Sequence, residues 1–146
     1  MAAAILAYHG ASPLLLDLQT DDEDEDHVLA LFKEKNLWGA ISKTNHPVLR
    51  WRDPVYKSVR ELAMSYFHEY FLPATGRKTF YAYSKPFDLS KFAPERWIMS
   101  EESLDWLAEA LDGSSHFPIA PKNVLRHARR ATVLERSASK LQQWRK

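Results

Sequence analysis

The fold of this chain is decided by one segment, which reads PLLLDL (13–18), TDDEDED (20–26), HVLALF (27–32) and KEKNLWGAISKTN (33–45). Short apolar runs bounded by turn-forming residues predict strands. The first run is apolar at nearly every position, which is expected of a strand buried on both faces. The runs at 28–32 and 38–42 are separated by a short polar turn and predict an antiparallel hairpin. The segment therefore predicts three strands, with an acidic loop between the first and the second.

Helices are predicted on both sides of this segment. The alanine-rich residues 2–8 favour a helix, and Gly10 follows where a helix often ends in a glycine. The clearest helical pattern spans 59–71, because its apolar residues recur at helical spacing, with Ser58 as N-cap and Glu61 completing a capping box. A further helix is predicted at 101–111, with these residues facing inward: Leu104, Leu107, Ala108 and Leu111.

The remaining segments predict less regular structure. Residues 79–83 are aromatic and β-prone and predict a short strand. Residues 45–54 contain two prolines and are expected to be irregular, and residues 85–94 are expected to form a loop. The basic segment 122–146 is predicted to be helical, with a break near Ala131. Together these patterns predict a single α+β domain over 1–146, in which a small antiparallel sheet packs against helices.

Composition excludes several classes of protein. The chain has 146 residues and no cysteine, which removes disulfides, zinc–thiolate sites and thiol nucleophiles. No apolar run approaches the roughly 18 residues that a membrane helix needs, so no membrane partner is expected. The apolar start lacks the basic residues of an export signal, and the expected location is the cytoplasm.

Charge is distributed unevenly along the chain. The formal net charge is +1, yet residues 21–26 are all acidic, and residues 122–146 carry eight bases against one acid. The basic segment either folds onto the acidic loop or is presented to a polyanion such as a nucleic acid. Phosphate contacts on a helix would come from these residues: Arg126, Arg129, Arg130, Arg136 and Lys140.

His27 is the most informative single residue, because it opens a predicted strand directly after the six acids. Those acids are expected to favour its protonated form. With the helix at 2–8, the strand PLLLDL and the later Trp38-Gly39, the arrangement resembles the transglutaminase-like branch of the papain-like cysteine enzymes. The resemblance implies an N-terminally truncated papain/transglutaminase-like core, with His27 as the catalytic histidine and Asn45 as the residue that orients its ring.

The nucleophilic cysteine of that family has no counterpart here. The resemblance implies that it would precede Ala7 by about two helical turns, at or before Met1. Three interpretations stay open: a degenerate member without catalysis, a true start further upstream that supplies the cysteine, or a chance similarity. The first makes His27 and Asn45 vestigial, in a pseudoenzyme that serves as a binding or scaffold protein for an unknown protein or peptide partner.

Two alternative functions follow from these patterns. One is a polyanion-binding module that uses the basic C-terminal segment. The other is a thiol acyl-transferase or peptidase, if an upstream cysteine exists. No metal or cofactor is expected: the acidic run lacks the glycine and distal glutamate of a calcium loop, His68-Glu69 lacks the second histidine of a zinc motif, and the glycines are too dispersed for a phosphate loop.

Overall fold

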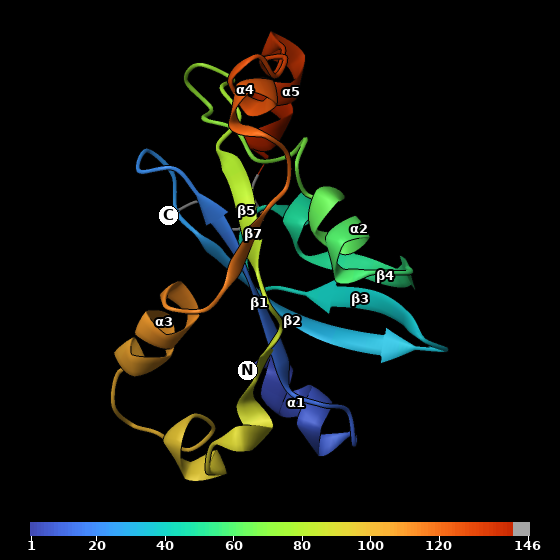
Figure 1. The fold of residues 1–146 in the computed structure, drawn as a ribbon, viewed down its shortest axis with the longest axis vertical. Helices are drawn as coiled ribbons and strands as arrows, with labels where there is room; N and C mark the ends of the chain where they lie inside the picture. Colours follow the sequence, from blue (N-terminus) through green and yellow to red (C-terminus); the bar gives the residue numbers. More distant parts are fainter. Residues whose placement is uncertain (142–146) are drawn as a thin grey trace.

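A computed structural model describes residues 1–141 of the chain, and an antiparallel sheet is its centre (Figure 1). The sheet order is β4-β3-β2-β1-β5-β7, with β6 pairing β1 off this path. All strand pairs are antiparallel, which confirms the predicted α+β class. The seven strands are β1 (Leu14–Thr20), β2 (His27–Glu34), β3 (Leu37–Ile41), β4 (Trp51–Tyr56), β5 (Phe80–Ser84), β6 (Phe87–Asp88) and β7 (His116–Pro118).

The three strands predicted from the opening segment are confirmed. In the β1–β2 pair, Leu14 lies opposite Leu31 and Leu18 lies opposite His27. β2 and β3 form a hairpin whose turn residues Lys35 and Asn36 both have positive φ, at 48° and 66°. That backbone gives the tight turn the twist that matches its flanking strands.

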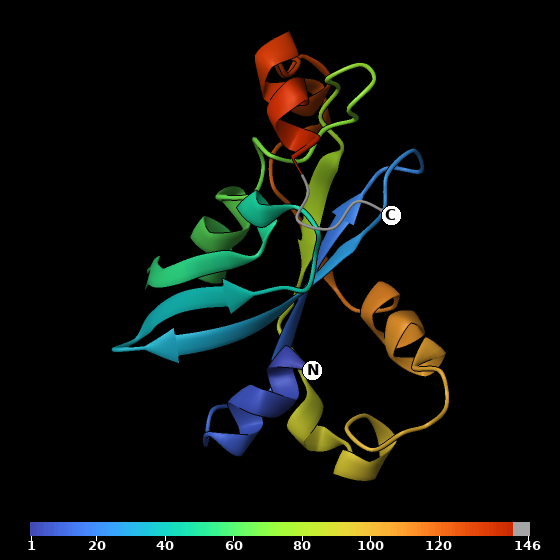
Figure 2. The same cartoon turned by 180° about the vertical axis from the view of Figure 1, so that it is seen from behind.

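Both faces of β1 are buried, as its sequence predicts. On one face Leu16 and Leu18 pack with α2 (Val59–Met64) and the residues that follow it. On the other face Leu15 packs with α1 (Ala2–Tyr8) and α3 (Asp105–Asp112). α1 lies beside the start of β1, whereas the acidic loop lies at the far end of that strand (Figures 1 and 2).

The prediction of one helix over 59–71 is wrong in its length, because α2 ends at Met64. Ser58 does cap it by accepting from Glu61 N, but the Glu61 carboxylate accepts from Lys57 N rather than closing a capping box. The Ser65 hydroxyl donates to Leu62 O, and the chain continues in turns. Such side-chain bonds to the backbone compete with the helix. Tyr66 and Tyr70, which belong to the apolar pattern predicted for that helix, are nevertheless buried.

The expectation of irregular structure at 45–54 is also wrong, because residues 51–56 form β4. β4 contains Pro54, which cannot donate to a neighbouring strand. β4 occupies the outer edge of the sheet, beside β3, where a proline is tolerated. The only other regular element in that stretch is the 3₁₀ turn η1 (Pro47–Leu49).

The remaining elements agree in part with the sequence. α3 begins at Asp105 rather than 101, so Leu104 and Ala108 are exposed while Leu107 and Leu111 face the core. The expected loop at 85–94 contains β6 and the 3₁₀ turn η2 (Leu89–Lys91), and a further turn, η3 (Pro94–Arg96), follows. The basic segment forms α4 (Lys122–Arg126) and α5 (Val133–Ser139), separated near Ala131 as predicted.

The part of that helical prediction that falls on 142–146 lies outside the described residues. Within 1–141, the helices are all too short or too polar to cross a bilayer.

Candidate functional site

His27 begins β2 and lies on the same face of the strand as Leu29 and Leu31. Its ring is 6.2 Å from the ring of Tyr70, measured between centroids. Burial lowers the pKa of His27 below its usual 6.5, and nearby His46 lowers it further. The expectation that the acidic neighbours favour the charged form is therefore wrong, because burial of the imidazole favours its neutral form.

The structure does not assemble the site implied by the transglutaminase-like resemblance. Asn45 is exposed, and no hydrogen bond joins it to His27 within residues 1–141. Its neighbour His46 lies near His27 instead. Sequence reasoning missed His46, although it directly follows the candidate residue Asn45. α1 packs against Ala30, on the face of β2 opposite His27, so residues of α1 do not face the imidazole.

The acidic loop is bound by residues that directly precede β5, not by the described part of the C-terminal segment. Arg77 forms ion pairs with Asp21 and Glu23, which raise the pKa of its guanidinium. Asp24 accepts a 2.6 Å hydrogen bond from the Thr79 hydroxyl. Within 1–141 no ion pair joins the loop to residues after 121, so the described part of the basic segment does not neutralise it.

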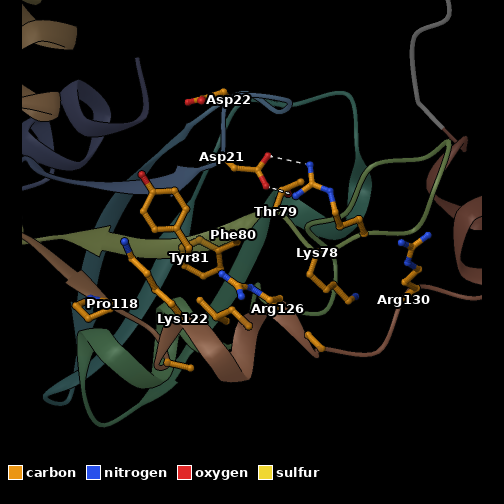
Figure 3. Close-up of a pocket in the computed structure, with 14 residues that line it drawn as sticks. Asp21, Asp22, Lys78, Thr79, Phe80, Tyr81, Pro118, Lys122, Arg126 and Arg130 are labelled. Carbon is orange, nitrogen blue, oxygen red and sulfur yellow. Dashed lines mark hydrogen bonds and ion pairs between the residues drawn. The ribbon is translucent and has the colours of Figure 1, made fainter.

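The five basic residues expected to bind a polyanion fall into two groups. Arg126 and Arg130 line a hollow of about 680 Å³ beside β5 (Figure 3). The other three lie outside it. Arg129 forms two hydrogen bonds with Glu135, of 2.8 and 2.9 Å, which hold the pKa of that carboxyl far below its usual range. Arg136 donates to Ala74 O, and Lys140 is exposed at the end of α5.

We call the 680 Å³ hollow the basic cleft. It is lined by five bases (Arg77, Lys78, Lys122, Arg126 and Arg130), by two acids (Asp21 and Asp22) and by seven further residues (Thr79, Phe80, Tyr81, Pro118, Ala120, Leu125 and Ala128). Lys122 and Arg126 extend from α4 toward Tyr81 and Phe80, while Arg130 stands at the far end beyond Lys78 (Figure 3). Burial lowers the pKa of Lys78, whose ammonium donates to His68 O. Because Asp21 is engaged by Arg77, the lining keeps a surplus of positive charge.

Gly76 joins the two sides of the basic cleft. Its φ is +72°, and its carbonyl accepts a 2.8 Å hydrogen bond from Ala131 N. A Cβ atom at this position would lie 2.4 Å from Ala131 O, so no other residue fits without movement. This contact holds the link between α4 and α5 against the turn that carries Arg77 and Lys78. Sequence reasoning missed that pair, although two adjacent bases after a glycine and before an aromatic strand were a visible signal.

A cluster of carboxylates is formed by three residues that do not line the basic cleft. Oxygen atoms of Asp17, Asp26 and Asp112 lie within 4.8 Å of one another. Asp17 already contacts His116 Nε2 at 3.0 Å, and Asp26 accepts from the backbone and hydroxyl of Thr20. Burial raises the pKa of Asp17. Two of the three carboxylates, Asp17 and Asp26, therefore already have protein partners.

Compared with known protein families and with curated proteins, the chain has no significant match to either. The class that the geometry defines is therefore an α+β protein with a positively charged cleft beside an aromatic strand.

Proposed function

We propose that the protein is a binding module for single-stranded nucleic acid and that the basic cleft is its binding site. One observation carries the proposal: Lys122, Arg126 and Arg130 line one cleft, and none of the three side chains has a hydrogen bond or ion pair with another residue of 1–141. Cations held without a protein counter-charge attract phosphate groups. Arg129, the immediate neighbour of Arg130, is by contrast neutralised by Glu135.

Tyr81 supports a single strand rather than a simple inorganic anion. Tyr81 is half-buried on β5 and lines the same cleft as Pro118 and Lys122. Single-strand binders combine a basic groove with aromatic rings on which bases stack, at about 1–3 kcal/mol for each base. Lys122 and Arg126 rise on either side of the aromatic residues Phe80 and Tyr81, so phosphate and base contacts can form together (Figure 3).

The test is binding of a fluorescent ten-nucleotide single strand, followed by anisotropy between 50 and 200 mM salt. With about three phosphates neutralised, the logarithm of the binding constant should fall with a slope near −2 against the logarithm of salt concentration. Arg126→Gln and Arg130→Gln should each weaken binding and reduce that slope by about 0.7. Tyr81→Leu should weaken binding with the slope unchanged, because it removes stacking and no charge.

Arg129→Gln is the matched control, since it removes the same charge one position away from Arg130 and outside the cleft. It should leave affinity and slope close to those of the unmodified chain. Equal weakening by the Arg129 and Arg130 substitutions would show that general charge, not the cleft, attracts the strand. No binding at 50 mM salt would refute the proposal.

The transglutaminase-like interpretation stays a prediction. The position of α1 on the face opposite His27 gives it no geometric support, and we do not propose a catalytic role for His27 and Asn45.

A further inference from the structure

The acidic loop, residues 21–26, meets the basic cleft at Arg77. Asp21 accepts two hydrogen bonds from the Arg77 guanidinium, one of them 3.3 Å long, and a Glu23 carboxylate oxygen lies 2.9 Å from the same group. Asp21 and Arg77 both line the cleft, and Figure 3 marks the contacts of the Asp21 carboxylate beside Thr79. The loop therefore places negative charge directly on a base of the proposed strand-binding site.

Arg77 differs in this respect from the other bases of the cleft. Within residues 1–141, it is the only one of the five that forms an ion pair. The Lys78 ammonium donates to a backbone carbonyl, and the other three side chains have no partner in that part of the chain. A guanidinium binds carboxylate and phosphate oxygens in the same forked geometry. The carboxylates of the loop therefore fill the position that a phosphate would take at Arg77.

This contact is accessible enough for a phosphate to displace it. The side chains of Arg77 and Asp21 are 35% and 33% exposed, and that of Glu23 is 69% exposed. Ion pairs between such accessible side chains are weak and are screened by salt. A strand already held by the neighbouring bases keeps its next phosphate at a high local concentration near Arg77. Carboxylate and phosphate can therefore exchange on this guanidinium.

The loop itself is held beside the cleft by other bonds. Asp21 N donates to Thr79 O at 3.2 Å, and the Thr79 hydroxyl donates to Asp24 at 2.6 Å. At the other end of the loop, Asp26 accepts from Thr20 N at 2.6 Å. These bonds tie the loop to the end of β1 and to the residue before β5. They do not involve Arg77, so the loop keeps its place when that guanidinium is released.

We propose that the acidic loop is a built-in competitor of the nucleic acid, in which the Asp21 and Glu23 carboxylates hold Arg77 and weaken binding of the strand. The inference rests on the proposed function, because it concerns the same cleft. Release of Arg77 adds one phosphate contact to about three. Each single-strand contact contributes about 0.7 to the salt slope, so affinity should rise about eightfold at 50 mM salt and about threefold at 200 mM.

The test compares two double variants of the full chain in the anisotropy assay with the ten-nucleotide strand. Asp21→Asn/Glu23→Gln removes both carboxylates from Arg77, and the asparagine keeps the oxygen that accepts from the backbone N of residue 23. This variant should show the gains given above, with a slope of about −2.8 instead of about −2.

The matched control is Asp22→Asn/Glu25→Gln, which removes two acids of the same types from the same loop. Neither side chain has a hydrogen bond or ion pair within residues 1–141, so the control leaves Arg77 engaged. Its affinity should change by less than about twofold, because exposed charges act weakly through salt. Equal gains in the two double variants would overturn the proposal, since they would reflect general repulsion by the loop.

An Arg77→Gln background tests the role of the guanidinium. Without it no base is released, so the gain from Asp21→Asn/Glu23→Gln should fall to that of the control. An undiminished gain in this background would contradict competition for Arg77.

The outcomes also separate this inference from the proposed function. If the unmodified chain binds the strand and Asp21→Asn/Glu23→Gln brings no gain, the competition is refuted and the binding site stands. If neither the unmodified chain nor this variant binds at 50 mM salt, both proposals fail.

Discussion

Replacing Gly76 with alanine should destabilise the protein more than the same change at Gly10. Both glycines have positive φ, +72° at Gly76 and +82° at Gly10. An alanine in this left-handed region costs about 1–2 kcal/mol at either position. The surroundings differ, because a Cβ at Gly10 would meet nothing within 4 Å, whereas at Gly76 it would lie 2.4 Å from Ala131 O.

The extra cost at Gly76 is that of moving the Ala131 backbone. Overpacking of a filled site costs about 1–3 kcal/mol, so Gly76→Ala should lose about 2–5 kcal/mol in total and Gly10→Ala about 1–2 kcal/mol. The free energy of unfolding is measured in urea by tryptophan fluorescence, with the midpoints compared at equal slope. Equal losses in the two variants would refute the contact between Gly76 and Ala131. Because that contact positions the link bearing Arg130, Gly76→Ala should also weaken binding of the single strand.

His27 should make the unmodified chain lose stability as pH falls from about 6.5 toward its lowered folded pKa, because the unfolded state then binds the proton more tightly. Urea midpoints of the unmodified chain and of His27→Gln, compared at pH 7.5 and 5.5, should therefore converge at the lower pH, and a constant gap would contradict the lowered pKa. Arg52→Lys should lower the free energy of unfolding by about 1–3 kcal/mol. The Arg52 guanidinium bonds to Ser65, Val48 O and Glu69, and it lies 4.0 Å from the Tyr66 ring centroid. One ammonium group cannot make all of these contacts. Arg60→Lys is the control, because the Arg60 guanidinium makes one hydrogen bond within residues 1–141, to Ile119 O, and it should cost less in the same urea assay.

Local patterns in the sequence correctly predicted the helices and strands that depend only on residues close together in the chain. Gly10 ends α1 with a positive φ, as its position after the alanine-rich run indicated. The apolar run of β1 is buried on both faces, and β2 and β3 form the expected hairpin. These predictions succeed because a strand or helix period is repeated over a few residues and needs no distant partner to be recognised.

The same patterns failed where distant residues intervene. α2 ends early, and beyond it Arg52 of β4 bonds to both the hydroxyl and the carbonyl of Ser65. β4 forms across Pro54 only because it is an edge strand, and an edge is a property of the whole sheet. The protonation of His27 was predicted with the wrong sign because six adjacent acids are visible in the sequence, whereas burial beside Tyr70 is not.

By itself, the sequence determined the α+β class, the central three strands, the lack of cysteine in these 146 residues and the excess of base near the C-terminus. Those properties depend on residue types and on short-range periodicity. Tertiary structure alone decided which charges are free to act. It paired Arg129 with Glu135 and Arg77 with Asp21, and it left Arg126 in a cleft. Charge pairing depends on distances of a few ångströms between segments far apart in the chain, and no local pattern records those distances.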